Sequence, residues 1–195
     1  MNKRRRGTTL LELMVAGMIA LTLGAGLFLF FESGYNSESF IMDHNNSTLD
    51  SRHGIDLITD GWKDPSSGVN YPGLMGATSL ASGTGPNVLI YNCVDSSGTS
   101  HVVQYWVSNG NLVRSVDGAP NNGTVVIQNV NNLSLNYWTW NGSSWVSSTN
   151  PGTPANVGAV DYQLTSNVDN QSVAMSGSVR IREIRCTISS NGDVF

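Results

Sequence analysis

Glu12 is the residue whose type and position most suggest chemistry. It is the only charged residue in the apolar segment from Thr8 to Phe31, and a carboxylate at membrane depth costs about 2.5–3.5 kcal/mol on insertion scales. Such a residue should have a cationic partner. Arg4 to Arg6 are near enough in an intact chain, whereas a cut after Gly7 would offer the new α-amino group of Thr8 from the same or a neighbouring chain. A glutamate at a helix end near the headgroups is the simpler interpretation.

Other residue types that catalyse reactions or bind metals form no recognisable pattern. His44 and His53 are nine residues apart and do not share a helix face as i, i+4 ligands would. His101 opens a predicted strand, and neither a Gly-x-Ser-x-Gly nor a Gly-x-x-x-x-Gly-Lys motif occurs. Asp95 and Asp117 lie in short polar segments, which we interpret as turns rather than as a calcium site. We therefore expect no catalytic residues, no cofactor and no metal.

Two cysteines, Cys93 and Cys186, are the candidates for a disulfide. If this part of the chain lies outside the cytosol, a bond between them would close a long loop and contribute nominally ~4–5 kcal/mol in the chain-entropy model. Two buried or free thiols are the alternative. Two cysteines alone cannot complete a four-ligand zinc site.

The basic residues are concentrated before Gly7. Lys3 and Arg4 to Arg6 are four of the ten basic residues, so removal of residues 1–7 leaves 6 basic against 14 acidic residues and changes the formal charge from -4 to -8. Sequence-independent binding to the phosphates of a nucleic acid needs clustered Lys and Arg. Nucleic acid is therefore not an expected partner.

The apolar segment is long enough to span a membrane. Its 24 residues would form a helix of about 36 Å, against a hydrocarbon thickness of about 30 Å. A cleaved secretory signal peptide is the main alternative, but its apolar region would be shorter and followed by a small-residue cleavage site. The cations before the segment place the N-terminus in the cytoplasm and the remainder outside.

A second, polar stretch from Glu32 to Trp62 keeps a helical period. Ile41, Thr48, Ile55 and Trp62 recur every seven residues, flanked by Phe40, Leu49 and Ile58, which predicts one narrow apolar stripe. The helix could run unbroken from Thr8 to Gly61, with a bend at Gly34 or Gly54. The Pro- and Gly-rich segment from Lys63 to Gly73 ends it, and a loop to about Gly85 follows.

The remainder predicts an antiparallel sheet of four to six strands that packs on the outer half of the helix, an α+β fold. Ser108 to Asn111 holds the Asn-Gly signal of a tight hairpin turn. Trp140 and Trp145 flank a polar loop, and they are interpreted either as a hairpin with packed aromatics or as a recognition patch. The strands are expected at Asn87–Val94, His101–Val116, Thr124–Trp140, Ala159–Asn167 and Ser176–Ile188.

The N-terminus resembles that of type IV pilins and type II secretion pseudopilins. The residues that carry the resemblance are "KRRRG" followed by "TTLLELMVAGMIALTLG": a short basic leader that ends in Gly, then an apolar helix with Glu as its fifth residue. The family implies that a prepilin peptidase cuts between Gly7 and Thr8 and N-methylates Thr8. It also implies that Glu12 pairs with the terminal amine of an adjacent subunit during assembly. Thr8 replaces the usual Phe, and Leu29 stands where many major pilins have a kinking Pro.

The later segments resemble the W-type minor pilins and the related J-type minor pseudopilins. The similar stretches are "LDSRHGIDLITDGWKDPSSG", "VVQYWVSNGNLVRSVDG" and "VVIQNVNNLSLNYW". The resemblance implies a subunit that initiates or caps a filament, with a cleaved leader (1–7), a transmembrane and filament-core helix (8–31), an amphipathic outer half (32–62) and a β-rich pilin-like head (63–195).

The implied partners are the prepilin peptidase, the inner membrane before assembly, and other major and minor pilin subunits that contact the N-terminal helix. The implied location is the inner membrane, with one span and an extracytoplasmic head, and afterwards the filament. The alternatives are a minor pseudopilin of a type II secretion system and a single-span anchor with an uncleaved leader and a β binding domain.

Overall fold

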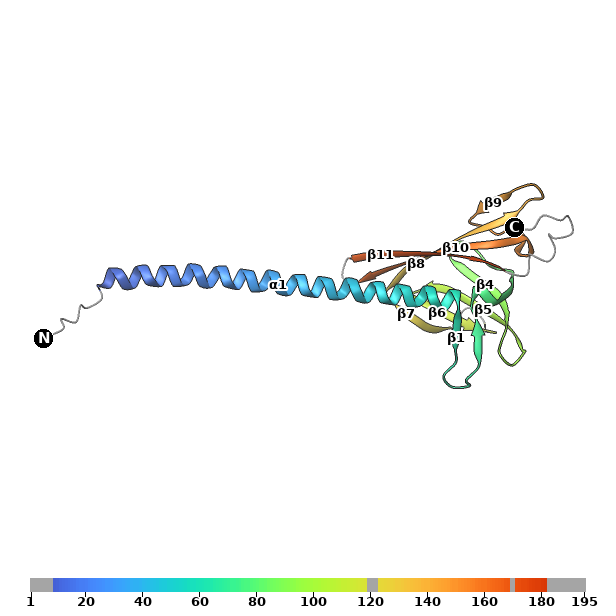
Figure 1. Cartoon of the computed structure of the whole chain (residues 1–195), viewed down its shortest axis with the longest axis horizontal. Coiled ribbons are helices and arrows are strands. Elements are labelled where there is room, and N and C mark those ends of the chain that lie inside the picture. Colours follow the sequence, from blue (N-terminus) through green and yellow to red (C-terminus); the bar gives the residue numbers. More distant parts are fainter. Residues whose placement is uncertain (1–8, 119–122, 169–170, 182–195) are drawn as a thin grey trace. The chain divides into compact units, whose positions relative to one another are not determined.

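The computed structural model describes residues 9–118, 123–168 and 171–181 and has an α+β architecture (Figure 1). Helix α1 (Leu10–Thr59) is long and apolar in its N-terminal half, and antiparallel sheets make up most of the remaining described chain. The chain divides into two compact units, Met1–Met42 and Asp43–Phe195. The α+β fold expected from the sequence is confirmed.

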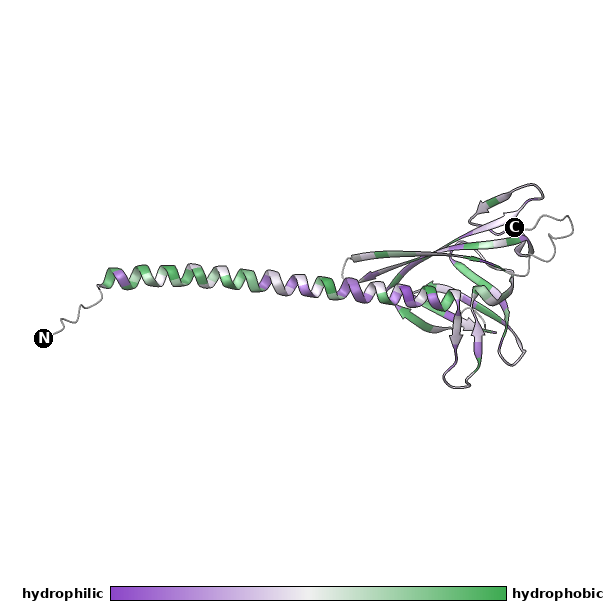
Figure 2. Cartoon of the chain, in the orientation of Figure 1, coloured by the Kyte–Doolittle hydropathy of each residue, from purple (hydrophilic) through white to green (hydrophobic). Residues whose placement is uncertain are grey.

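The N-terminal half of α1 is a candidate membrane span. Its apolar side chains point outward on all sides, and Figure 2 shows the hydrophobic colour concentrated in this half of the helix. The helix ends at Thr59, two residues before the predicted end, because Gly61 adopts φ +94° and opens a strand. That conformation is left-handed, so it cannot continue an α-helix. No interruption occurs at Gly34 or Gly54.

The C-terminal part of α1 buries only the second half of the predicted stripe. Ile58 is buried, and Ile55 and Trp62 pack against the core, whereas Phe40, Ile41 and Leu49 are more than half exposed. The other buried positions of the helix are the small residues Ser47, Ser51 and Gly54. A Cβ atom on Gly54 would lie 2.6 Å from Cδ1 of Ile127 and 2.7 Å from Cδ2 of Leu164. Small residues are therefore needed where the helix backbone approaches the sheets. A pattern of apolar residues cannot reveal that requirement.

The strands form two sheets and a small hairpin rather than the single sheet predicted. The five-stranded sheet has β3 (Ala77–Leu80), β4 (Val88–Val94), β5 (Ser100–Ser108), β6 (Asn111–Val116) and β7 (Thr124–Gln128) in that order. The four-stranded sheet has the order β11 (Gln171–Arg180), β10 (Val157–Val168), β8 (Val130–Trp140) and β9 (Trp145–Ser148). β1 (Gly61–Lys63) pairs with β2 (Asn70–Pro72), and every pairing is antiparallel.

Asn129 explains why one predicted strand became two. The run from Thr124 to Trp140 is divided at this residue, which has φ +58°. The strands on either side of it belong to different sheets. Asparagine tolerates the left-handed conformation better than most residues do, so the chain can leave one sheet here and enter the other.

Further boundaries differ from the prediction. The segment after Lys63 expected to be a loop contains β2, the short 3-10 helix η1 (Leu74–Gly76) and β3, and the polar loop after Trp140 contains β9 and η2 (Pro154–Asn156). β11 begins five residues before the predicted Ser176, and the end of that predicted strand, 182–188, lies outside the described residues. The turn at Asn109 and Gly110 is confirmed, with φ +50° and +72°, as a type I′ hairpin requires.

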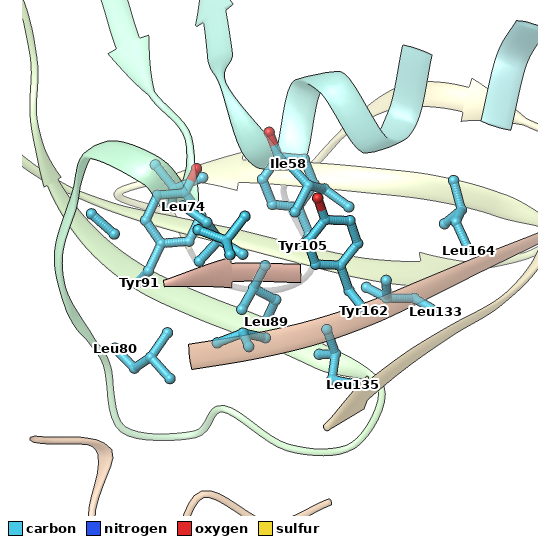
Figure 3. Close-up of a cluster of buried hydrophobic side chains, with 14 of the residues drawn as sticks. Ile58, Leu74, Leu80, Leu89, Tyr91, Tyr105, Leu133, Leu135, Tyr162 and Leu164 are labelled. Atoms are coloured by element: carbon cyan, nitrogen blue, oxygen red, sulfur yellow. The ribbon is translucent and has the colours of Figure 1, made fainter. Parts of the chain in front are cut away.

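One hydrophobic core takes side chains from both sheets and from Ile58 of α1 (Figure 3). Its largest fully buried side chains are three tyrosines, and each hydroxyl donates to a backbone carbonyl oxygen. Tyr91 bonds to Pro72 at 3.2 Å, Tyr105 to Leu57 at 3.2 Å and Tyr137 to Gly85 at 2.7 Å. Buried hydroxyls need such partners, so these bonds attach the core to the end of α1, to the end of β2 and to the loop at Gly85.

Candidate functional site at the start of the N-terminal helix

Glu12 and Thr9 form a capping box at the beginning of α1. The backbone N–H of Thr9 donates to Oε2 of Glu12 at 3.0 Å, and the backbone N–H of Glu12 donates to Oγ1 of Thr9 at 3.4 Å. The carbonyl of Thr9 accepts the first helical hydrogen bond from Leu13. Thr9 is thus the N-cap and Glu12 the third residue of the helix. The carboxylate also lies at the positive end of the helix dipole.

The capping box gives Glu12 a role that sequence reasoning missed. Its signal was present, since Thr-x-x-Glu before an apolar run is the sequence pattern of a capping box. One carboxylate oxygen is held by the chain's own backbone. Gly7 and Thr8, the predicted cleavage and methylation residues, lie outside the described residues, as do Arg4 to Arg6. The predicted pairing of Glu12 with a terminal amine therefore remains a prediction.

The surroundings of Glu12 on the helix are apolar. Leu10, Leu11 and Leu13 are each at least 70% exposed, and large apolar side chains follow on every face up to Phe31. A helix that is apolar all round needs lipid or other apolar helices around it. In such surroundings the charged form of a carboxylate is stable only with a partner.

Only one cysteine of the candidate disulfide, Cys93, lies in the described residues. Cys93 is buried in β4, and burial, assisted by the negative charges of Asp117 and Asp95, raises the pKa of its thiol to about 11. A thiol with so high a pKa is a poor nucleophile at neutral pH. Cys186 lies outside the described residues, so the pairing remains a prediction.

His101 lies between two carboxylates, an arrangement that the sequence did not indicate. Its Nδ1 lies 2.5 Å from Oδ2 of Asp117, and its Nε2 lies 3.1 Å from Oδ2 of Asp95. The bond to Asp117 and, to a smaller extent, the bond to Asp95 raise the pKa of the imidazole, although burial opposes the shift. Hydrogen bonds from Ser97, Thr99 and His101 lower the pKa of Asp95 despite its burial. Because both ring nitrogens are engaged, we assign this cluster a structural role.

The β1–β2 hairpin is attached to the same region by aromatic contacts. The ring of Tyr71 meets the ring of His101 edge-on at 5.1 Å, and Trp62 stacks on Tyr71 at 4.7 Å. The guanidinium of Arg114 lies 3.6 Å above the Trp62 ring, within the range of a cation–π interaction. The backbones of Asn70 and Ser96 add a hydrogen bond of 3.1 Å.

The tryptophans flanking the polar loop pair as a hairpin. Trp140 in β8 opposes Trp145 in β9, and their ring centroids are 5.5 Å apart. This confirms the hairpin with cross-strand aromatics. Among the described residues, no group of three or more His, Cys, Asp or Glu side chains has an arrangement that could hold a metal ion.

Comparison of the chain with known protein families, with curated proteins and with solved structures finds no match.

Proposed function

We propose that this chain is a minor pilin-like structural subunit that takes part in type IV pilus assembly in an initiation or tip complex. The observation that carries the proposal is the start of α1, where one carboxylate held at the helix N-terminus precedes a segment that is apolar on every face. Lipid surrounds the apolar side chains of such a segment before assembly, and a bundle of like helices buries them afterwards.

In this proposal the prepilin peptidase cuts after Gly7 and methylates Thr8, which leaves a cationic amine next to the capping box. Glu12 then holds the backbone N–H of Thr9 with one carboxylate oxygen and pairs through the other with the amine of an adjacent subunit. A carboxylate without a cation is penalised in a dry helix bundle, so the pair favours the axial register that satisfies it. Contacts with other pilin subunits run along the N-terminal half of α1.

The same chemistry would serve a minor pseudopilin of a type II secretion system. The capping box itself favours a second function, a single-span membrane anchor with an intact leader, because there Glu12 stabilises the helix end and needs no neighbouring subunit.

Sequencing the N-terminus of the chain purified from its native membrane tests the proposal. A start at methylated Thr8 supports a filament subunit, whereas a start at Met1 would support the anchor. Loss of the pilus, or of secretion, on deletion of the chain's gene separates the two filament systems.

A further inference from the structure

The face of the four-stranded sheet that points away from the core is polar. Strands β8, β10 and β11 lie side by side (Figure 1), and Asp161 opposes Asn136 on one side and Ser178 on the other. Two residues along, Gln163 opposes Ser134 and Ser176. Alternate residues of a strand share a face, so these side chains form one surface, which we call the polar face: Ser134, Asn136, Asp161, Gln163, Ser176 and Ser178, with exposed Arg180 at its end beside Ala159.

The polar face carries a shallow, open depression of about 520 Å³, to which Tyr162 and Gly177 also contribute. Asp161, Asn136 and Ser134 are half-buried at its centre, while Gln163, Ser176 and Ser178 are exposed. Donors and acceptors thus line a hollow that solvent can enter.

A tryptophan flanks this hollow and fixes its only carboxylate. The indole Nε1 of Trp138 donates to Oδ2 of Asp161 at 2.6 Å, although the Trp138 side chain remains 36% exposed. The ring of Trp145, which is 45% exposed, packs over Gly158 of β10. Trp138 pairs with Ala159 and Ser147 in the sheet, and two residues along the strand Trp140 pairs with Trp145. Exposed indoles and the polar face therefore share one side of the sheet.

We propose that the polar face binds a neutral oligosaccharide. Sugar rings have an apolar C–H surface that can stack on an exposed indole, and a rim of hydroxyl groups that can bond to carboxylate, amide and hydroxyl groups. The face carries one carboxylate, Asp161, and one exposed guanidinium, Arg180, so its formal charges cancel. A face without net charge offers no electrostatic attraction to an acidic polysaccharide and leaves neutral ones as the complementary class. The site goes beyond the proposed assembly role and does not depend on it.

Titration of the full chain in lipid nanodiscs with cellohexaose, chitohexaose and maltohexaose tests the site, read by calorimetry and by tryptophan fluorescence. At least one of the three should bind with a Kd of about 1 mM or lower. Trp138→Ala should weaken that binding at least about tenfold by removing the stacking surface, and Asp161→Asn several-fold by changing the central acceptor. Alginate, an acidic polysaccharide, should not bind.

A second variant keeps the test decisive if Trp138→Ala fails to fold. Ser176→Arg places a long side chain at an exposed position in the hollow and should also weaken binding at least about tenfold, with an unchanged circular dichroism spectrum. Asp50→Asn, an exposed carboxylate on α1, is the matched control and should bind like the wild type. The proposal is overturned if no neutral hexasaccharide binds at about 10 mM, if alginate binds instead, or if folded Ser176→Arg binds as well as the wild type.

Discussion

The backbone N–H of Thr9 donates to the carboxylate of Glu12 at 3.0 Å, so the capping role of Glu12 can be tested separately from the assembly role that we propose for it. Glutamine can replace glutamate in a capping box but carries no charge. We therefore expect Glu12→Gln to keep membrane insertion and to abolish incorporation into filaments. Thr9→Val loses the side-chain half of the box, about 0.5–2 kcal/mol of helix stability, and should still assemble. Immunoblots of sheared filaments measure the incorporation.

The same two variants give the reverse result if Glu12 has no role in assembly. If Glu12 acts only as a cap, Glu12→Gln would assemble like the wild type while Thr9→Val would be impaired.

Gly54 lies where α1 closely approaches both sheets. A Cβ there would lie under 3 Å from the ends of Ile127 and Leu164, which are both buried. Gly54→Val should therefore cost about 2–3 kcal/mol by overpacking, a drop in Tm of roughly 4–12 °C. Gly34→Val is the control, since nothing lies within 4 Å of a Cβ there. An unchanged Tm in Gly54→Val, measured by circular dichroism, would contradict the close packing.

Asn129 has the left-handed conformation at the corner between β7 and β8. A β-branched residue is strained in that conformation, so Asn129→Val should destabilise the fold by about 1–2 kcal/mol, while Asn129→Gly should be nearly neutral. The matched control is Asn132→Val, an exposed position within β8 that a β-branched residue suits. Urea titrations give the three free energies of unfolding. Equal costs for Asn129→Val and Asn132→Val would refute the conformational argument.

The free energy of unfolding should depend on pH through His101 on the alkaline side and through Asp95 on the acidic side. The pKa of His101 is raised, so its contribution is complete below the unfolded value of about 6.5 and is lost as the pH rises through the folded value. The pKa of Asp95 is lowered by the bonds from Ser97, Thr99 and His101, so its contribution is present above about 3.9 and is lost as the pH falls.

His101→Gln tests the alkaline side of this dependence. It should be less stable than the wild type at pH 6, and the difference should shrink on going to pH 9 and above. His53→Gln, at an exposed position of α1, should follow the wild type at every pH. A pH-independent difference between His101→Gln and the wild type, in Tm scans, would show that the ring's charge is not involved.

Cys93 should react slowly in the folded chain. A pKa of about 11 leaves at least about 100-fold less thiolate at pH 8 than an ordinary cysteine has, and the side chain is fully buried. In a Cys186→Ser variant, iodoacetamide should therefore alkylate Cys93 only after denaturation. In the wild type, an intact mass that is two hydrogens lower without reductant would confirm the predicted disulfide. Full alkylation of the folded variant within minutes would contradict the burial.

The sequence alone determined the elements whose signals are local. The apolar span has its signal in composition, and the turn at Asn109 and Gly110 in one dipeptide, because both depend on neighbouring residues only. The capping box of Thr9 and Glu12 also has a local signal, two residues three apart, although it was not predicted.

Only the tertiary structure decided what depends on residues far apart in the chain. Asn129 divides a continuous β pattern because the two halves pair with different partners, and Gly54 is needed because two sheets converge on the helix. His101 meets Asp95 and Asp117 only through the pairing of β4, β5 and β6. The polar face likewise exists only because β8, β10 and β11 pair in this register. Long-range packing sets these relationships, and local propensity does not encode it.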